Sequence, residues 1–310
     1  MLPQQFTKIT TNGVKGLILA RLDTGPVGWI NDVAMRVTSD QATETYGWLA
    51  DAPALREFIG GRTPAELAEN SFQISNKDYE GSIAIKSKDM RRDKFGMIQI
   101  RANQLADRAN DHPAKLLSSL IIAGESTACY DGQFFFDTDH SEGSSGAQSN
   151  DIGASATAPT NPTADEFGDA VMGAIQAILG FKDTRGEPMN QSASNFTVMV
   201  PIPFMKAGFK AVTALLGTGG VSATLPNLKQ YFNVNIVPNP RLTWTTKFAV
   251  FRTDEAAKPF ILQEETIPEA IALGEGSEYE QLNKEQLFGI DWTGNVGYGY
   301  WQQACLVTLA

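Results

Sequence analysis

Residues 69–140 constrain the fold of this chain more than any other stretch of its sequence. Apolar and polar residues alternate at 72–74 and again at 83–85, which is typical of two half-buried strands, and the polar residues 76–81 between them indicate a turn. A long amphipathic helix is predicted at 100–123. An isolated two-stranded hairpin is only marginally stable in water, and little apolar sequence surrounds this one. We therefore expect a projecting hairpin that is covered by another copy of the chain.

The helix predicted at 100–123 contains a proline. Pro113 removes a backbone donor, so the helix either kinks there or restarts with Asp111 as its cap. Gly124 is a natural end for the helix. None of these residues forms a combination that catalysis needs, so the segment favours subunit packing over chemistry.

The charge of the chain argues against a surface that grips nucleic acid. The formal net charge is −10 and the isoelectric point is near 4.8, whereas such a surface needs a stripe of lysine and arginine. The densest basic cluster is Arg91, Arg92 and Lys94, and Asp89 and Asp93 partly neutralise it. We interpret this cluster as a solvated loop or as part of an ion pair between subunits.

Two cysteines, Cys129 and Cys305, are too few and too far apart for a disulfide framework or a zinc site. Their apolar and aromatic surroundings predict buried free thiols in a reducing cytosol. The N-terminal sequence lacks the pattern of a secretory signal, and the apolar residues 16–20 are too short to span a bilayer. We therefore expect no membrane association.

Residues 1–38 are predicted to form an N-terminal arm. Val14, Leu17 and Ile18 recur at helical spacing, which indicates a short amphipathic helix that the Gly-Pro pair at 25–26 ends. Such a helix cannot hide its apolar face alone. It must therefore lie on its own domain or on a neighbouring subunit.

Glycine pairs and stretches without large apolar residues indicate how the rest of the chain is divided. Residues 55–59 predict a short helix that the glycine pair at 60–61 ends. Residues 141–163 are nearly free of large apolar side chains, so we expect a flexible loop or linker and a domain boundary there. The remaining elements are a helix after Thr163, a strand at 197–201, a helix at 203–216 and strands from 231 onward. Helices and strands mix without regular alternation, which predicts an α+β fold.

One cluster has the chemistry of a metal or acid–base site. Asp137, Asp139 and His140 place two carboxylates and an imidazole within four residues. His112 is the other histidine of the chain, whereas a catalytic zinc site usually needs three protein ligands. The phenylalanines at 134–136 instead favour a packed turn with a solvated polar end. A metal-dependent hydrolase that uses these three residues is the alternative from a different functional class.

The sequence contains no G-x-S-x-G or H-E-x-x-H motif, no P-loop and no dinucleotide-binding fingerprint. The glycine-rich residues 294–299 lie within strand-like sequence, so they predict a bent strand or close backbone packing. Residues 217–220 lack the lysine of a phosphate loop and are interpreted as a flexible tip.

Three motifs together resemble those of one protein family. They are W-x-x-x-x-P-x-L-R-E-F-I-G at Trp48–Gly60, ISNKDY at Ile74–Tyr79 and CYDGQFFFDTDH at Cys129–His140. In this order, over some ninety residues, they resemble the major head subunits of Mu-like tailed bacteriophages. The resemblance implies the Hong Kong 97 type of capsid fold and the function of a major capsid protein.

The resemblance also implies a domain plan and a set of partners. Its parts would be an N-terminal arm at 1–40, an extended loop at 41–95, a peripheral domain at 96–163 and 263–310 with a long spine helix, and an axial domain at 164–262. Such subunits form the hexamers and pentamers of an icosahedral shell around double-stranded DNA. The implied partners are further copies of the chain, a scaffolding protein, a portal and, in some heads, a decoration protein. The protein would reside in the virion after assembly in the host cytoplasm.

The resemblance implies no catalytic, cofactor-binding or metal-binding residues. Another structural protein of the virion, such as a tail-tube or decoration protein, is the alternative within the same class. The candidates for contacts between subunits are Leu17, Ile18, Trp48, Arg56, Phe58, Phe72, Ile74, Tyr79, Ile83, Arg91 and Arg92.

Overall fold

The computed structural model describes residues 11–26, 28–47, 72–92, 96–213 and 232–310. Three predictions lie outside these residues: the helix at 55–59, the tip at 217–220, and the contact candidates Trp48, Arg56 and Phe58. Within the described residues, no helix is long and apolar enough to cross a membrane.

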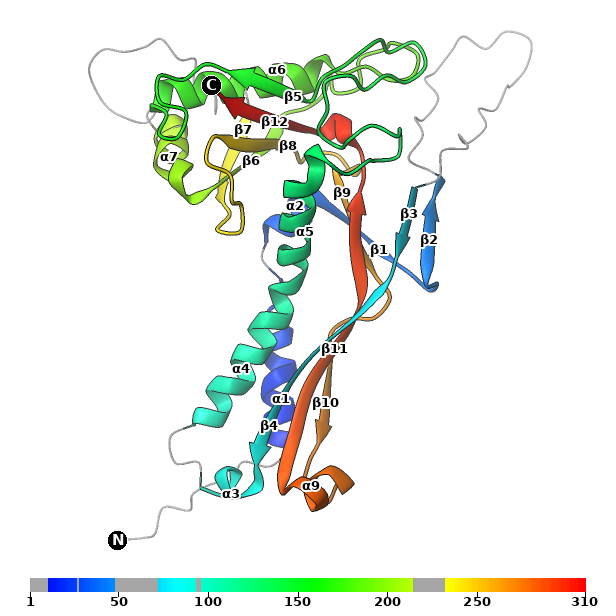
Figure 1. Cartoon of the computed structure of the whole chain (residues 1–310), viewed down its shortest axis with the longest axis vertical. Coiled ribbons are helices and arrows are strands. Elements are labelled where there is room, and N and C mark those ends of the chain that lie inside the picture. The colour runs from blue at the N-terminus through cyan, green and yellow to red at the C-terminus, as the bar shows by residue number, and fades with distance from the viewer. Residues whose placement is uncertain (1–10, 27, 48–71, 93–95, 214–231) are drawn as a thin grey trace, which may run out of the picture.

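A five-stranded sheet and two helices form the broad end of the molecule (Figure 1). The strands, in sheet order, are β5 (Asp151–Ala154), β12 (Ala304–Leu309), β8 (Lys247–Arg252), β6 (Asn195–Val200) and β7 (Asn233–Pro238). Helices α6 (Ala164–Gly180) and α7 (Met205–Thr213) pack here, and the apolar face of α6 is buried against β12 and β8. This sheet therefore combines strands from three distant parts of the chain.

Helix α6 begins directly after Thr163, as predicted. The hydroxyl of Thr163 accepts a hydrogen bond from the backbone N–H of Glu166, and the Glu166 carboxylate accepts from the backbone N–H of Thr163. This reciprocal pair is a capping box, which satisfies two otherwise unpaired donors at the helix end. Phe167, Val171 and Ile175 on one face of α6 are buried, as their spacing predicts.

A second, elongated sheet extends away from the broad end (Figure 1). Its strand order is β1 (Ala34–Thr38), β9 (Phe260–Glu264), β11 (Glu285–Tyr298) and β10 (Glu269–Leu273), and β4 (Lys77–Lys86) also pairs with β11. Helices α1 (Thr11–Leu22) and α4 (Met97–Asn110) cover one face of its far part. Short helices α2 (Trp29–Val33), α3 (Ser87–Met90) and α9 (Glu278–Asn283) complete this part of the chain.

The long helix predicted at 100–123 is present as two segments, α4 and α5 (His112–Ile122). Asp111 between them keeps helical backbone angles: its N–H donates to the Asp107 carbonyl, and its carbonyl accepts from the N–H of Lys115. The Asp111 side chain makes no cap hydrogen bond, so the helix does not restart on a new cap. Pro113 lies in the first turn of α5, where a missing donor costs least.

The predicted hairpin is wrong. β3 (Phe72–Ser75) pairs with β2 (Thr43–Tyr46), whereas β4 pairs with β11, and the residues 77–81 expected in a turn belong to β4. A strand with one solvated face alternates in the same way whatever its partner is, so local alternation cannot identify that partner.

The loop predicted at 141–163 is present for most of its length, but part of it belongs to the sheet of the broad end. Residues 151–154 form β5, and His140 and Gln148 form a bridge across the preceding loop. The buried amide of Asn150 donates to the Phe135 carbonyl at 2.8 Å and accepts from the Asp137 N–H at 2.9 Å. Hydrogen bonds therefore order this segment in place of apolar packing.

Gly294 of β11 and Gly299, the first residue after this strand, permit close packing, as their sequence predicts. A Cβ on Gly299 would lie 2.4 Å from the carbonyl oxygen of Lys258, and one on Gly294 would lie 2.5 Å from the carbonyl oxygen of Gln263. Both obstacles are backbone atoms that cannot rotate away. The backbone of β11 therefore approaches its neighbours more closely than any other residue would allow.

Replacing Gly299 with alanine is expected to lower the free energy of unfolding by about 1–3 kcal/mol, the usual cost of overpacking. Gly16 in α1 provides the matched control, because a Cβ there meets nothing within 4 Å. Gly16→Ala should raise the free energy of unfolding by about 0.5–1 kcal/mol, since alanine loses less entropy in a helix. Denaturant unfolding followed by circular dichroism measures both, and equal effects of the two changes would contradict the packing argument.

Candidate assembly surfaces

Helix α1 lies on its own subunit. Ile18 and Val14 are fully buried in a cluster with Phe288 of β11 and Ala106 of α4, and Leu17 is half-buried. The predicted helix of the arm therefore completes the core of the chain itself. Of the two contact candidates on this helix, only Leu17 offers part of its side chain to a neighbour.

A polar network fixes the base of the β2–β3 ribbon. Tyr46 donates to the Gln263 side chain at 2.7 Å, and Gln263 donates to Asn76, the single residue between β3 and β4, at 2.6 Å. Burial, followed by the charge of Glu44, raises the pKa of Tyr46 to about 12. The tyrosine thus stays protonated and keeps its donor.

Ile74 and Phe72 of β3 lie beside this polar network, at the base of the β2–β3 ribbon. Ile74 is 3% exposed and packs with Tyr46 and Ile261, whereas Phe72 is half-buried. A Cβ on Gly297 of β11 would lie 2.3 Å from Ile74, so this glycine makes room for the ribbon. Ile74 therefore takes part in the subunit's own core, and Phe72 retains some surface for a neighbour.

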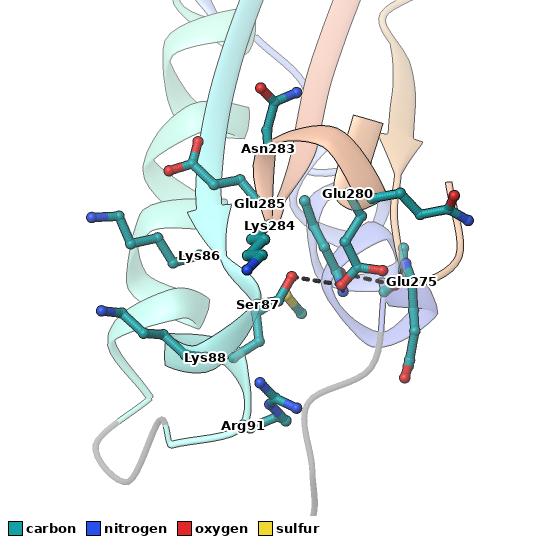
Figure 2. Close-up of a pocket in the computed structure, with 13 residues that line it drawn as sticks. Lys86, Ser87, Lys88, Arg91, Glu275, Glu280, Asn283, Lys284 and Glu285 are labelled. Carbon is teal, nitrogen blue, oxygen red and sulfur yellow. Dashed lines mark hydrogen bonds between the residues drawn. The ribbon is translucent and has the colours of Figure 1, made fainter. Parts of the chain in front are cut away.

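The far end of the elongated sheet carries several exposed charges around a cavity of about 570 Å³ (Figure 2). Glu280 of α9 accepts hydrogen bonds from Ser87 at 2.5 Å and from the N–H of Gly276 at 2.8 Å. The hydrogen bond from Ser87, followed by that from Gly276, lowers the pKa of Glu280. The remaining charges of this end point outward, and Arg91 and Arg92 are both exposed. These two candidates stay available for contacts between subunits.

Asp137, Asp139 and His140, the residues of the alternative metal-dependent site, do not come together. The carboxylate of Asp137 accepts from the N–H groups of Phe134 and Thr138, and Asp139 is exposed. His140 instead turns inward and pairs with Asp131 at 2.6 Å. Asp137 therefore caps a turn beside the buried Phe135 and Phe136, which confirms the packed turn that the sequence favours over the metal-dependent alternative.

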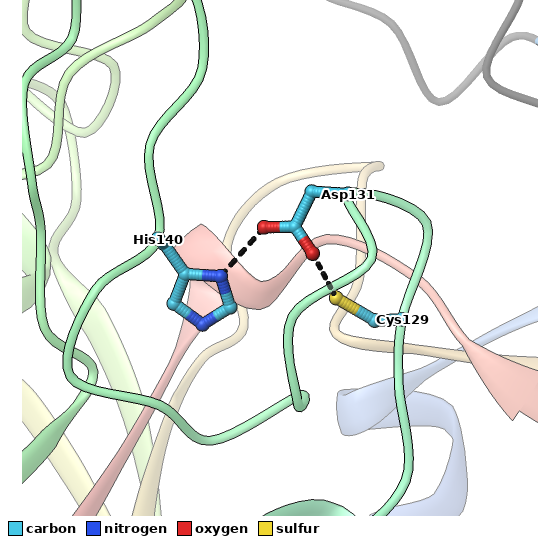
Figure 3. Close-up of side chains that lie close together, drawn as sticks. All are labelled: Cys129, Asp131 and His140. Carbon is cyan, nitrogen blue, oxygen red and sulfur yellow. Dashed lines mark hydrogen bonds and ion pairs between the residues drawn. The ribbon is translucent and has the colours of Figure 1, made fainter.

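Cys129, Asp131 and His140 form a buried hydrogen-bonded cluster (Figure 3). One oxygen of Asp131 faces Nδ1 of His140 at 2.6 Å, and the other accepts from the thiol of Cys129 at 2.9 Å. The ring of His140 is fully buried and stacks on Trp301 with a centroid separation of 4.0 Å. The hydrogen bonds hold the loop after α5 together, and the stacking joins it to Trp301, just before β12.

Protonation in this cluster follows from burial and pairing. Burial, together with the charge of Asp131, raises the pKa of Cys129 far above its ordinary value, so the thiol remains a donor. Burial alone would raise the pKa of Asp131, but the hydrogen bonds from His140 and Cys129 outweigh it and lower that pKa. The three atoms lie within 4.8 Å of one another and are the group among the described residues that could hold a metal ion. As they stand, each is already bonded within the cluster.

Sequence reasoning missed Asp131 because it looked for neighbouring ligands. Asp137, Asp139 and His140 lie within four residues, but a turn directs their side chains apart. The alternation of Cys129 and Asp131 ahead of an aromatic run was the available signal that both side chains lie on one side of the loop. Cys129 and Cys305 are both buried free thiols, as predicted.

Comparison with known proteins identifies the family. The model of the Mu-like prophage major head subunit gpT matches residues 20–161 and 227–308, which is more than half of the chain. The chain belongs to this family. The members of this family are the major head subunits of Mu-like prophages.

Two relatives and two solved structures illustrate the likeness. The FluMu major head subunit of Haemophilus influenzae is 37% identical over 112 residues, which is 36% of either chain. The major capsid protein of Escherichia phage Mu is 25% identical over 89% of this chain and 65% of its own. The head subunit described here thus spans less than two thirds of the length of both relatives.

The solved structures are capsids of bacteriophage JBD30. The procapsid subunit has a TM-score of 0.58 at 22% identity and covers 99% of this chain and 76% of its own. The subunit of a capsid decorated with minor capsid protein trimers has a TM-score of 0.50 at 19% identity and covers 92% and 65%. The predicted α+β capsid fold of the Hong Kong 97 type is confirmed.

Proposed function

We propose that this head subunit is a major capsid protein, which assembles with copies of itself into the icosahedral shell of a phage head. The observation that carries the proposal is the match of the head-subunit family to both the α4–α5 region and the C-terminal strands. Closed rings of identical subunits require two different matching surfaces on each copy. An elongated part that projects from a broad end supplies such surfaces on opposite sides (Figure 1).

The proposed domain plan follows the sheets. Residues 1–40 would act as the arm, 41–95 as the extended loop, and α4 and α5 as the spine of a peripheral domain at 96–163 and 263–310, without the strands β5 and β12. The axial domain expected at 164–262 would also include β5 and β12, because both strands belong to the sheet of β6, β7 and β8. Hexamers and pentamers would form around this axial part.

The proposed partners are a scaffolding protein, a portal and a decoration protein. The likeness to a JBD30 capsid that is decorated with minor capsid protein trimers supports the last of these. The acidic net charge supports a shell that holds double-stranded DNA without binding it tightly. The mature protein would reside in the virion after assembly in the host cytoplasm.

Electron microscopy of the expressed chain tests the proposal. The chain, alone and with its scaffolding protein, is expected to form rings, tubes or polyhedral shells in negative stain. The positions in such shells of the half-buried candidates Leu17, Phe72, Tyr79 and Ile83 and of the exposed Arg91 and Arg92 would then test them individually. A chain that stays monomeric under both conditions would overturn the assignment.

A further inference from the structure

A groove lies between the spine helices and the elongated sheet. Its apolar part, about 340 Å³, is lined by Leu105 and Ala109 of α4 and by Tyr79 and Trp292 of β4 and β11. The indole nitrogen of Trp292 and Nε2 of His112 are buried here, and neither has a hydrogen-bond partner. Buried polar groups without partners are rare and call for an explanation. Two polar groups of this groove thus lack hydrogen-bond partners within one subunit.

The rim of the groove is positively charged. Arg108, Lys115 and Arg241 line an adjoining cavity of about 650 Å³, and none of the three forms an ion pair within the described part of the chain. Asp107 beside them is already paired with Arg21, which leaves Asp111 as the free carboxylate of this cavity. Burial, followed by the charges of Lys115 and Arg241, lowers the pKa of His112. A cationic rim on so acidic a chain fits an acidic occupant.

The outer edge of β10 carries an acidic residue and exposed apolar residues, which would complement the cationic rim and the apolar part of the groove. Among the described strands β10 hydrogen-bonds to β11 alone, so its other edge is unpaired. Glu269 and Ile271 face away from the helices, and Ile267 just before the strand is 72% exposed. Proteins usually cover or charge an unpaired edge, and exposed apolar residues on it indicate a partner.

The two surfaces lie on opposite sides of the elongated part. Helix α1 contacts both α4 and β10 and thus separates them, with α4 along one side and β10 along the other (Figure 1). Copies placed side by side in one direction would therefore bring the edge of one to the groove of the next. This is the heterologous arrangement that closes rings.

We propose that the groove between α4, α5, β4 and β11 of one subunit receives the acidic outer edge of β10 from a second copy. Ile267 or Ile271 would occupy the apolar part, and Glu269 would meet the cations of the rim. This inference rests on the proposed assembly function and names one interface within it.

Charge reversal and its rescue test the interface. Lys115→Glu and Glu269→Lys are each expected to reduce the yield of shells about tenfold or more, because each places like charges opposite one another. The chain that carries both changes should recover most of the wild-type yield. Arg101→Glu, an exposed change on α4 with the same charge difference, is the control and should assemble normally. Equal losses from the control, or no rescue by the pair, would overturn the inference.

Disulfide trapping provides an independent measurement. Oxidised shells of a Lys115→Cys/Glu269→Cys chain should give dimers and larger ladders on a non-reducing gel, whereas either single variant should give monomers. Lys182→Cys/Glu269→Cys is the control pair, since Lys182 is an exposed residue just after α6 and far in the fold from the groove residues. Shells of the test pair that stay monomeric on the gel would overturn the interface but leave the capsid function intact. If the unmodified chain forms no shells at all, the proposed function itself fails.

Discussion

Replacing Asp131 with alanine is expected to lower the free energy of unfolding by about 3–5 kcal/mol, the cost of breaking a buried pair by removing one partner. The change leaves Nδ1 of His140 and the thiol of Cys129 buried without an acceptor. Nε2 of His140 already lacks a hydrogen-bond partner, so the ring would lose its hydrogen bond to Asp131 as well. Thermal or denaturant unfolding of the soluble subunit measures the effect.

The dependence of this effect on pH has a definite sign. Because the folded structure lowers the pKa of Asp131, its contribution is complete above the unfolded pKa, ordinarily 3.8, and is lost as the pH falls through the lower folded value. The wild type and Asp131→Ala should therefore differ fully at neutral pH and converge in acid. Asp139→Ala, an exposed change in the same loop, should stay within about 0.5 kcal/mol of the wild type. A similar loss from both variants would contradict the cluster's role.

Replacing Ile74 with aspartate is expected to prevent folding of the subunit. Loss of a buried isoleucine side chain alone costs about 2–5 kcal/mol, and an unpaired carboxylate in the same site adds to this. Ile74 packs on Tyr46 and Ile261, and the network of Gln263 lies beside it. Solubility and circular dichroism of the expressed variant measure the outcome.

The neighbouring residue supplies the control for this change. Gln73 lies on the same strand but is exposed, so Gln73→Asp should leave folding within about 0.5 kcal/mol of the wild type. A soluble, folded Ile74→Asp protein that fails only to assemble would show that Ile74 serves a contact between subunits.

Local signals in the sequence predicted local structure well. The helix predicted after Thr163 begins at Ala164, and Thr163 with Glu166 three residues later forms a capping box at its start. The glycines at 294–299 likewise predicted close packing of β11. In both cases the information lies within a few residues of the feature.

Pairing between distant strands could not be predicted in this way. β4 shows the alternation of a half-buried strand, but its partner β11 lies about two hundred residues further along the chain. Likewise, the spacing of Val14 and Ile18 predicted an apolar helix face but not whether the same subunit covers it. The site at Asp131 depends on how a loop folds back on itself, which no period in the sequence encodes.

The pairing of β4 with β11 decides how the chain can change shape. All ten residues of β4 pair with β11, from Lys77 opposite Gly294 to Lys86 opposite Glu285, a length of about 30 Å. A shift of the register between β4 and β11 by one residue would turn Ile83 and Ile85 outward to water, so the two strands keep their register and move as one rigid unit. Any displacement of the β2–β3 ribbon must then be a rotation about Asn76, the residue that directly precedes β4.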